Sequence, residues 1–551
     1  MLGDQPGRPA LSGYLPPREL WPERLFALPQ YRQPERLNVA EFLLDRNLSR
    51  GLADKTAIFC GSQQLTYLEL AEKVNRLASS LVKLGIDRYD RVMLRFTNTP
   101  EFIISWLAIV KIGAICVSTM PLLRKRELGY IANDSEAKAV IVASGLVEEL
   151  EKATNEFSTV ERIIVAGPYS GDCISFQDLV EAGESDFAAA STGRDDPAII
   201  SYTSGSTGQP KGTVHFHEDL LNCTEAYGQH ILAPTPDDVF SGHPTMAFTF
   251  GLGALLLFPL RWGATTVLLP SFSPEKVYGA IEGHRVTVLF GSPTSFRMML
   301  AKQDRDYDLS SLRVCASAGE PLPASVFHQW KERFGVELLE HIGSTEMLYA
   351  FISNVSGQAR PGSCGRVLPG YQARVVDKDF NEMSPGQVGQ LAVKGPIGCL
   401  YWRKPDQQRE YVRFGGWNFP GDLVTRDEEG YFYYQCRADD LIISGGYNIA
   451  AIEIEQALME SPVVVDAAVV GSPDPIRNQK VKAFVILKKG VSPSELLIEE
   501  LQDSVKNILA PYKYPREIEF VSYLPRTQTG KIRRVELRER EMKKYQQQGA
   551  G

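Results

Sequence analysis

The feature that most constrains the fold is a loop rich in serine, threonine and glycine that follows an apolar run at residues 198–200. The loop reads Ser-Tyr-Thr-Ser-Gly-Ser-Thr-Gly-Gln-Pro-Lys-Gly over residues 201–212. A buried strand ending in glycines predicts a phosphate-binding turn, because glycine lets backbone N–H groups converge on an anion and hydroxyls add further donors. Lysine supplies a mobile positive charge. The predicted phosphate contacts are Thr203, Ser204, Gly205, Ser206, Thr207, Gly208 and Lys211.

A flexible linker is the simplest alternative for a segment of this composition. Linkers seldom follow a buried strand or end in Pro-Lys-Gly, so we prefer the phosphate loop. The segment also differs from the Walker A motif, in which the lysine stands between glycine and serine or threonine. Here Lys211 stands between Pro210 and Gly212.

Up to residue 438 the chain alternates amphipathic segments with short apolar runs. Thr66 precedes an amphipathic segment that ends at Leu84, which predicts a capped helix. A second helix is predicted through Trp106, and strands are predicted at residues 91–96, 114–118, 140–142, 163–165, 266–269 and 286–290. This alternation predicts layered α/β sheets with parallel strands. Residues 371–377 and 389–394 predict a β-rich subdomain.

The character of the chain changes after Arg437. The patterns predict helices at residues 452–459 and 496–509, strands at 463–470 and 482–487, and a basic tail. We therefore predict an α/β protein with a large N-terminal domain, residues 1–438, and a small mobile α+β domain, residues 439–551. The proline- and arginine-rich residues 1–35 predict an irregular arm on the surface, without a functional role.

Charge and composition exclude several classes of function. The 551 residues carry a formal charge of −8, which gives no basic field for nucleic acid. No apolar run is long enough to cross a bilayer and no signal peptide is evident, so we expect no membrane association and a cytoplasmic location. The eight cysteines are spaced singly, which predicts reduced structural thiols. The oligomeric state stays open, with a homodimer as one option.

Six further motifs follow the phosphate loop in order. They are Ser317-Ala318-Gly319-Glu320-Pro321, Ile342-Gly343-Ser344-Thr345-Glu346, Gly421-Asp422, Arg437-Ala438-Asp439-Asp440, Ser444-Gly445-Gly446-Tyr447 and Pro525-Arg526-Thr527-Gln528-Thr529-Gly530-Lys531. With these motifs the chain resembles, over nearly its whole length, the adenylate-forming enzymes, which include acyl-CoA synthetases, luciferases and the adenylation domains of peptide synthetases. The resemblance implies ATP, Mg2+ and coenzyme A as cofactors or co-substrates.

Forming an acyl-adenylate brings a carboxylate onto an anionic α-phosphate, so the site must neutralise charge and hold the line of attack. The resemblance implies that Glu346 holds Mg2+ and that Thr345 donates to the α-phosphate. A carboxylate and a hydroxyl are oxygen groups of the kind that magnesium prefers. It implies that Asp422 accepts both ribose hydroxyls and that Arg437 contacts the ribose. The residues expected beside adenine are Gly319, Glu320, Pro321, Glu340 and His341.

Lys531 matches the family lysine that reaches from the small domain to bridge the substrate carboxylate and the α-phosphate, where its ammonium offsets negative charge. A solvated lysine in a basic tail is the alternative. Asp439 matches the family hinge, about which the small domain turns between the two half-reactions. The resemblance then places Ser444, Gly445 and Gly446 against the pantetheine arm of CoA. Many relatives continue with Tyr-Arg-Ile-Gly, whereas residues 447–450 read Tyr-Asn-Ile-Ala, so the contact to the CoA nucleotide is not assigned.

The acyl pocket is predicted from a substitution. Relatives that accept acetate carry a tryptophan two positions before the Thr of Thr-Glu, where this chain has Gly343, which predicts room for an aryl or medium-chain acid. The other residues expected in the pocket are Phe248, Thr249, Phe250, Gly251, Tyr349 and Ala350. This set resembles benzoate- and 2-aminobenzoate-CoA ligases. The Tyr349 hydroxyl and the small Ala350 favour 2-aminobenzoate (anthranilate) over benzoate, whose activating relatives often have His and a larger aliphatic residue there.

The resulting hypothesis is an AMP-forming acid–thiol ligase that releases pyrophosphate and then makes an aryl-CoA thioester. Its alternatives within the family are a medium-chain acyl-CoA synthetase, an acyl-AMP ligase that loads a carrier protein, and a luciferase-like oxygenase. A non-catalytic nucleotide sensor is the alternative from another class. A sensor would not require the lysine, the hinge and the glycine surface together.

Overall fold

The computed structural model describes residues 11–203, 210–302, 306–444, 447–474, 478–509, 513–526 and 530–549. The chain divides into two compact units, residues 1–373 with 393–420 and residues 374–392 with 421–551. The predicted boundary at Asp439 lies inside the second unit, where Leu423 and Cys436 before it share a core cluster with Ala450 after it. A hinge at Asp439 concerns movement and stays a prediction.

Seven strands form one sheet of the first unit, in the order β7 (Ile174–Ser175), β6 (Arg162–Ala166), β5 (Ala137–Ala143), β3 (Arg91–Arg95), β4 (Ile115–Thr119), β8 (Pro197–Thr203) and β9 (Lys211–Phe216). Neighbouring strands are parallel except β8 and β9, which form an antiparallel hairpin. The helices α3 (Pro100–Lys111), α4 (Lys125–Ser135) and α6 (Phe176–Ala182) pack on this sheet, α5 (Val147–Glu151) packs against α4, and α2 (Tyr67–Lys83) packs against α3 and α6. The predicted parallel α/β layer is confirmed, although the sequence did not predict β9.

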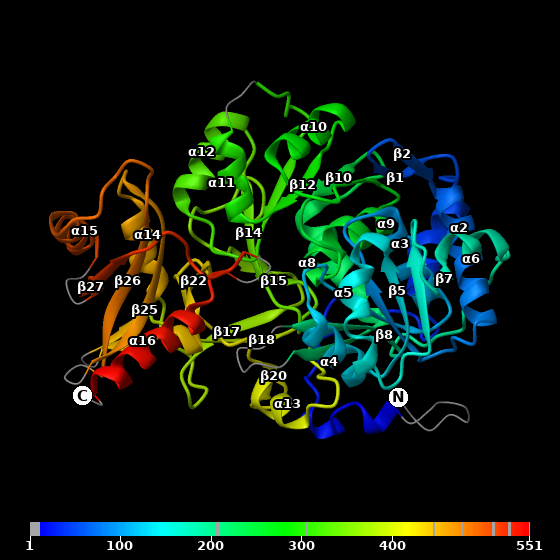
Figure 1. Ribbon diagram of the computed structural model, residues 1–551, viewed down its shortest axis with the longest axis horizontal. Coiled ribbons are helices and arrows are strands. Elements are labelled where there is room, and N and C mark those ends of the chain that lie inside the picture. The colour runs from blue at the N-terminus through cyan, green and yellow to red at the C-terminus, as the bar shows by residue number, and fades with distance from the viewer. Residues whose placement is uncertain are drawn as a thin grey trace. The chain divides into compact units, whose positions relative to one another are not determined.

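Nine strands form the other sheet, in the order β16 (Arg366–Val367), β15 (Ala350–Ser353), β14 (Leu338–Gly343), β13 (Val314–Ser317), β12 (Val288–Gly291), β10 (Val239–Gly242), β11 (Thr265–Leu268), β1 (Thr56–Cys60) and β2 (Gln63–Thr66). The six strands from β14 to β1 are parallel. Figure 1 shows α10 (Pro274–His284), α11 (Pro293–Ala301) and α12 (Ala324–Phe334) grouped beside β12 and β14, with which they share a core around the buried Trp330. Loops after parallel strands meet at one edge of a sheet, where α/β proteins bind ligands.

Shorter elements complete the first unit. They are α1 (Arg46–Ser49), α7 (His217–Cys223), α8 (Thr249–Leu252), α9 (Phe258–Trp262), α13 (Pro405–Tyr411), β19 (Val412–Arg413), β20 (Trp417–Asn418), and π-helical segments at Glu41–Asp45, Thr224–Leu232 and Gly253–Leu257. No helix in the described part of the chain is both long and apolar enough to span a membrane.

The second unit is α+β, as predicted. A β-rich part contains β17 (Gln372–Val376), β18 (Gly389–Lys394), β21 (Asp422–Arg426) and β22 (Phe432–Arg437). A second sheet has the order β24 (Tyr447–Ile449), β23 (Ile442–Ser444), β26 (Asn478–Leu487) and β25 (Val464–Asp474), with β27 (Glu517–Phe520) parallel to β26. Its helices are α14 (Ala451–Met459), α15 (Glu495–Ile508) and α16 (Arg534–Gly549). Lys482 ties α16 to the sheet through carboxylates of Glu517 and Glu541 at 2.5 and 3.0 Å.

The N-terminal arm is irregular but more deeply packed than the sequence predicted. Tyr31 is fully buried and its hydroxyl donates to the Pro369 carbonyl at 2.6 Å. The Arg24 guanidinium donates to Glu218 at 2.7 Å and to Asp219 at 3.0 Å, and both carboxylates belong to buried residues. Prolines and arginines on their own predict a solvated segment, whereas here they carry a buried ion-pair network that only the fold supplies.

Helix α2 starts at the predicted cap. The Thr66 hydroxyl accepts from the Glu69 N–H at 3.2 Å, and the Glu69 carboxylate accepts from the Thr66 N–H at 2.8 Å, which is a capping box. Replacing Thr66 with alanine is therefore expected to lower the free energy of unfolding by about 1 kcal/mol. Urea unfolding checks this; an unchanged midpoint would mean that the cap contributes nothing.

Candidate active site

The phosphate loop closes the hairpin formed by β8 and β9. Thr203 and Lys211 are directly opposite each other in the strand register, so the two residues frame the loop. The other predicted contacts, Ser204, Gly205, Ser206, Thr207 and Gly208, lie outside the described residues. Because Lys211 starts a strand, its backbone is fixed while its side chain can reach an anion.

The predicted pair Thr345 and Glu346 lies in a tight turn between the antiparallel strands β14 and β15. The Leu348 N–H donates to the Thr345 carbonyl at 3.0 Å, and Leu348 has a left-handed φ of 65°. Thr345 and Glu346 are both half-buried. The turn therefore holds a hydroxyl and a carboxylate on a short, constrained backbone.

Strand β9 contacts this turn through His215, a residue that the sequence analysis missed. Its Nε2 lies 2.8 Å from the Thr345 carbonyl oxygen. Burial lowers the pKa of His215 to about 3, so the imidazole is neutral and Nε2 donates to the carbonyl. The phosphate-loop hairpin and the Thr345 turn are thus joined by a buried hydrogen bond.

Tyr401 is a second residue that no motif marked. Its hydroxyl donates to Glu346 Oε1 at 2.9 Å, and the Lys211 ammonium lies 5.7 Å from the centre of its ring. Burial and the neighbouring Cys399 and Glu346 raise the pKa of Tyr401, so the phenol stays protonated. The predicted phosphate-binding Lys211 and the predicted catalytic Glu346 therefore both lie beside one tyrosine.

The predicted adenine segment is brought beside Glu340 by the pairing of β13 and β14. Ser317, just before Gly319, is the register partner of Glu340. The Leu322 N–H, which follows the segment, donates to Glu340 Oε1 at 3.0 Å. Burial raises the pKa of Glu340 to about 8, so this carboxyl is mainly neutral at pH 7. Within the segment, the carboxylate of Glu320 accepts from the Thr294 hydroxyl at 2.6 Å.

Some of the predicted acyl-pocket residues share an aromatic cluster. The ring centre of Phe250 lies 6.0 Å from that of Tyr349 and 5.4 Å from that of His341. Tyr227 and Phe258, which the sequence analysis missed, each lie 4.9 Å from the Tyr349 ring. No local motif marks them, because the fold brings them in from a π-helical segment and from α9.

The Tyr349 hydroxyl is the unusual member of this cluster. Tyr349 is 5% exposed, and its hydroxyl has no hydrogen-bond partner among the described residues. The neighbouring Tyr227 hydroxyl, by contrast, pairs with His341 Nδ1 at 3.1 Å. A buried hydroxyl without a partner is destabilising, so this oxygen can accept or donate to a bound molecule.

Gly343 has a tighter environment than the pocket argument assumed. A Cβ atom there would lie 2.3 Å from the Tyr349 carbonyl oxygen, because β14 and β15 approach closely. Gly251 is similarly constrained, with 2.1 Å to the Thr245 carbonyl oxygen. Any side chain at Gly343 would therefore shift the backbone of β15. Of the remaining predicted residues, Thr249 and Ala350 are buried and Phe248 is half-buried.

The two residues predicted to contact the ribose lie in the second unit and pair with each other. Asp422 and Arg437 are register partners in β21 and β22, and Arg437 donates to the Asp422 carboxylate at 3.0 Å. Asp439 follows in a single helical turn, and Ser444 ends β23 with a buried side chain. The predicted Gly445 and Gly446 lie outside the described residues.

Lys531 lies directly before the bridge residue Ile532 and three residues before the start of α16. Arg526 and Ile532 form an isolated β-bridge, and the Arg526 guanidinium also binds the Gly530 carbonyl and Asp466. The Lys531 side chain is exposed. The lysine is therefore presented on a backbone that Arg526 holds from both sides.

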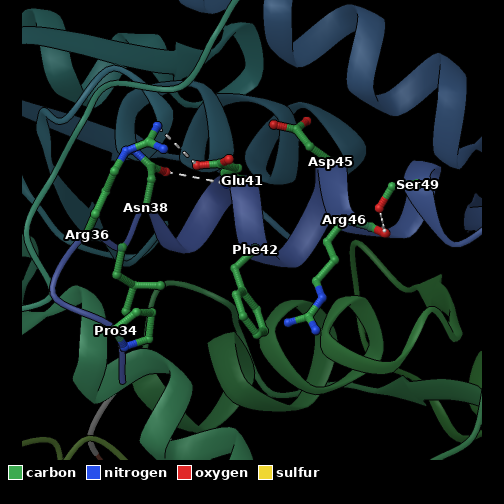
Figure 2. A pocket seen from close by; sticks show the side chains of 9 residues that line it. Pro34, Arg36, Asn38, Glu41, Phe42, Asp45, Arg46 and Ser49 are labelled. Atoms are coloured by element: carbon green, nitrogen blue, oxygen red, sulfur yellow. Dashed lines mark hydrogen bonds and ion pairs between the residues drawn. The ribbon is translucent and has the colours of Figure 1, made fainter. Parts of the chain in front are cut away.

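A cavity of about 430 Å3 lies elsewhere in the first unit and contains none of the predicted site residues (Figure 2). Its lining residues are Pro34, Arg36, Leu37, Asn38, Glu41, Phe42, Asp45, Arg46 and Ser49. Several polar groups pair within the lining, as Arg36 does with Glu41, and the Asp45 carboxylate lies 2.7 Å from the Lys111 ammonium. We assign no role to this cavity.

Three predicted parts of the site lie at the ends of sheet strands: the hairpin of the phosphate loop, the turn with Thr345 and Glu346, and the adenine segment. This arrangement is that of a nucleotide-dependent α/β enzyme. Residues 44–401 match the family model of the AMP-binding enzymes, and residues 453–531 match the model of the C-terminal domain of those enzymes. The chain therefore belongs to the AMP-binding, or adenylate-forming, enzymes. The resemblance stated from the sequence motifs is confirmed.

Similar proteins agree with this family. A benzoate–CoA ligase of Thauera aromatica is 39% identical, with 93% of this chain and 97% of the relative covered. A 4-hydroxybenzoate–CoA/benzoate–CoA ligase of Rhodopseudomonas palustris is 33% identical, with 91% and 94% covered. The crystal structure of the anthranilate CoA ligase AuaEII with anthranoyl-AMP has a TM-score of 0.88 and 35% identity, covering 93% of this chain and 98% of that one.

Proposed function

We propose that this enzyme is an ATP-dependent acid–CoA ligase that acts on an aryl carboxylic acid, with 2-aminobenzoate preferred over benzoate. The observation that carries the proposal is the meeting of Lys211, Thr345 and Glu346 around Tyr401 and His215. It is supported by similarity to benzoate–CoA ligases along nearly the whole chain. Two half-reactions follow from the residues.

In the first half-reaction a carboxylate oxygen of the acid attacks the α-phosphorus of ATP, and the bond to pyrophosphate breaks. Lys211 and the loop at residues 203–208 bind phosphate oxygens, and Thr345 donates to the α-phosphate. Lys531 offsets the charge that collects between carboxylate and phosphate. No protein nucleophile is needed, since positioning and charge neutralisation carry phosphoryl chemistry.

The donor set fits magnesium. Glu346 uses Oε1 to accept from Tyr401, and its other carboxylate oxygen has no hydrogen bond to the described residues. That oxygen and the Thr345 hydroxyl are hard donors of the kind Mg2+ prefers, so Glu346 would hold the ion with Thr345 beside it. When bound, the ion would neutralise the phosphates.

In the second half-reaction the sulfur of CoA attacks the acyl carbonyl of the adenylate, and AMP leaves with the electron pair of the broken C–O bond. Ser444, Gly445 and Gly446 would border the pantetheine arm, where glycine permits close approach. A turn about Asp439 would exchange Lys531 for this surface. Asp422 and Arg437 would hold the ribose in both steps.

The preference for 2-aminobenzoate is supported by the buried Tyr349 hydroxyl. An ortho amino group could donate to this oxygen, which otherwise lacks a partner among the described residues. Tyr349→Phe is therefore expected to lower the ratio of kcat/KM for 2-aminobenzoate to that for benzoate by about tenfold. Steady-state CoA-ester formation with both acids gives the ratio.

Tyr278→Phe is the matched control, because it also removes a buried hydroxyl, one that donates to the Met299 carbonyl at 2.7 Å. It should leave the ratio unchanged. An unaltered ratio in Tyr349→Phe would remove the basis for the 2-aminobenzoate assignment while leaving the ligase reaction intact.

Pyrophosphate release with Mg-ATP and CoA across acetate, hexanoate, benzoate, 2-aminobenzoate, 4-hydroxybenzoate and cinnamate tests the whole proposal. Highest kcat/KM with 2-aminobenzoate or benzoate is the expected result. A maximum at hexanoate would indicate a medium-chain synthetase, and release that needs a carrier protein would indicate an acyl-AMP ligase. No acid-dependent release would favour a sensor, and light from luciferin and oxygen would favour an oxygenase.

A further inference from the structure

Tyr401 contacts the proposed metal-binding carboxylate but belongs to none of the motifs identified in the sequence. Its backbone is fixed by strand-like pairing with β9. The Val214 N–H donates to the Leu400 carbonyl at 2.8 Å, the Trp402 N–H donates to the Gly212 carbonyl at 2.8 Å, and Thr213 and Tyr401 are antiparallel bridge partners. The tyrosine is thus anchored to the strand that begins with Lys211.

Alternation along this segment decides where the Tyr401 side chain goes. Successive side chains of an extended segment point to opposite faces. Leu400 and Trp402 lie in the core of the seven-stranded sheet, whereas Tyr401 packs with Cys399 and Tyr411. A shift of the segment by one residue would remove the phenol from Glu346.

Tyr401 is linked to the Thr345 turn in two ways, directly through its hydroxyl and indirectly through Tyr411. Its hydroxyl donates to Glu346 Oε1 at 2.9 Å. Its ring packs edge-on against Tyr411 at 5.7 Å between centres, and the Tyr411 hydroxyl lies 3.2 Å from Ser344 Oγ. Tyr401 is 3% exposed, so water cannot readily replace this contact.

We infer that Tyr401 is a positioning residue for adenylation, which fixes one oxygen of the Glu346 carboxylate so that the other is presented to a divalent cation and the nucleotide phosphates. This inference rests on the proposed function. Its action passes through Glu346, because Tyr401 itself contacts neither acid nor nucleotide in the proposal. Loss of the hydroxyl should therefore affect metal-dependent binding and adenylation, and spare thioester formation.

The test compares the full-length wild type with Tyr401→Phe. Acid-dependent ATP–pyrophosphate exchange at limiting Mg2+ is expected to fall by roughly 10- to 100-fold in the variant. The Mn2+ affinity of the enzyme with α,β-methylene-ATP, read by electron paramagnetic resonance, should fall by about tenfold. Metal-free AMP binding and CoA-ester formation from supplied aryl-adenylate should change by less than about twofold.

Tyr278→Phe is the matched control, because it removes a buried tyrosine hydroxyl that donates to the Met299 carbonyl at 2.7 Å, in a core that contains neither Tyr401 nor Glu346. It should leave all four measurements unchanged. Adding Tyr401→Phe to Glu346→Gln should not weaken Mn2+ binding further, since the two residues act in series.

If Tyr401→Phe kept the Mn2+ affinity and the ATP–pyrophosphate exchange rate of the wild type, the inference would be overturned. Equal losses in both half-reactions and in metal-free AMP binding would also overturn it, because they would indicate general damage to the fold. A wild-type protein without acid-dependent exchange would instead contradict the proposed function.

Discussion

Replacing Lys531 with alanine is expected to reduce adenylation by roughly 100- to 1,000-fold or more, because a positive charge aimed at the developing transition state is removed. CoA-ester formation from supplied aryl-adenylate should stay within about twofold of wild type, since the bond to the α-phosphate is already made. ATP–pyrophosphate exchange measures the first step, and single-turnover thioester formation measures the second. The expected result is that Lys531→Ala slows adenylation strongly and thioester formation hardly at all.

Arg533→Ala is the control for Lys531→Ala. Arg533 lies two residues away in the same basic segment and pairs with Glu536 at 3.0 Å on the surface. Its loss should leave both half-reactions unchanged, because an exposed ion pair contributes little. Equal loss of both half-reactions in Lys531→Ala would contradict the assigned role, and no loss in either would favour the solvated-lysine interpretation.

Replacing Glu346 with glutamine is expected to lower adenylation by roughly 100-fold or more, because the charge that would hold Mg2+ is lost while the side-chain shape is kept. The amide oxygen can still accept from Tyr401, so the change isolates the charge from the hydrogen bond. Pyrophosphate exchange as a function of Mg2+ concentration checks this, and the half-saturating Mg2+ concentration should rise.

Glu136→Gln provides the comparison, since Glu136 is another carboxylate that accepts from a tyrosine hydroxyl in the same unit. It should leave the Mg2+ dependence unchanged. If Glu346→Gln kept the wild-type Mg2+ requirement and rate, the carboxylate would not be the metal ligand and the role inferred for Tyr401 would fall with it.

Much of the fold could be predicted because its signals are local. The capping box of α2 and the apolar runs of the parallel strands depend on residues close together in the sequence. The domain boundary was harder to predict. Residues 421–438 read as a continuation of the first domain, but they belong to the second compact unit, where Leu423 and Cys436 pack with Ala450.

The sequence by itself determined the family, because ordered motifs such as Thr345-Glu346 and Thr529-Gly530-Lys531 are specific to one chemistry. It also determined the parallel α/β layer, since hydrophobic periodicity is a local property. Only the tertiary structure decided which side chains support those motifs. His215, Tyr227 and Tyr401 occur in no motif. They contact predicted site residues because strand pairing and packing bring together residues more than a hundred positions apart or in a different loop.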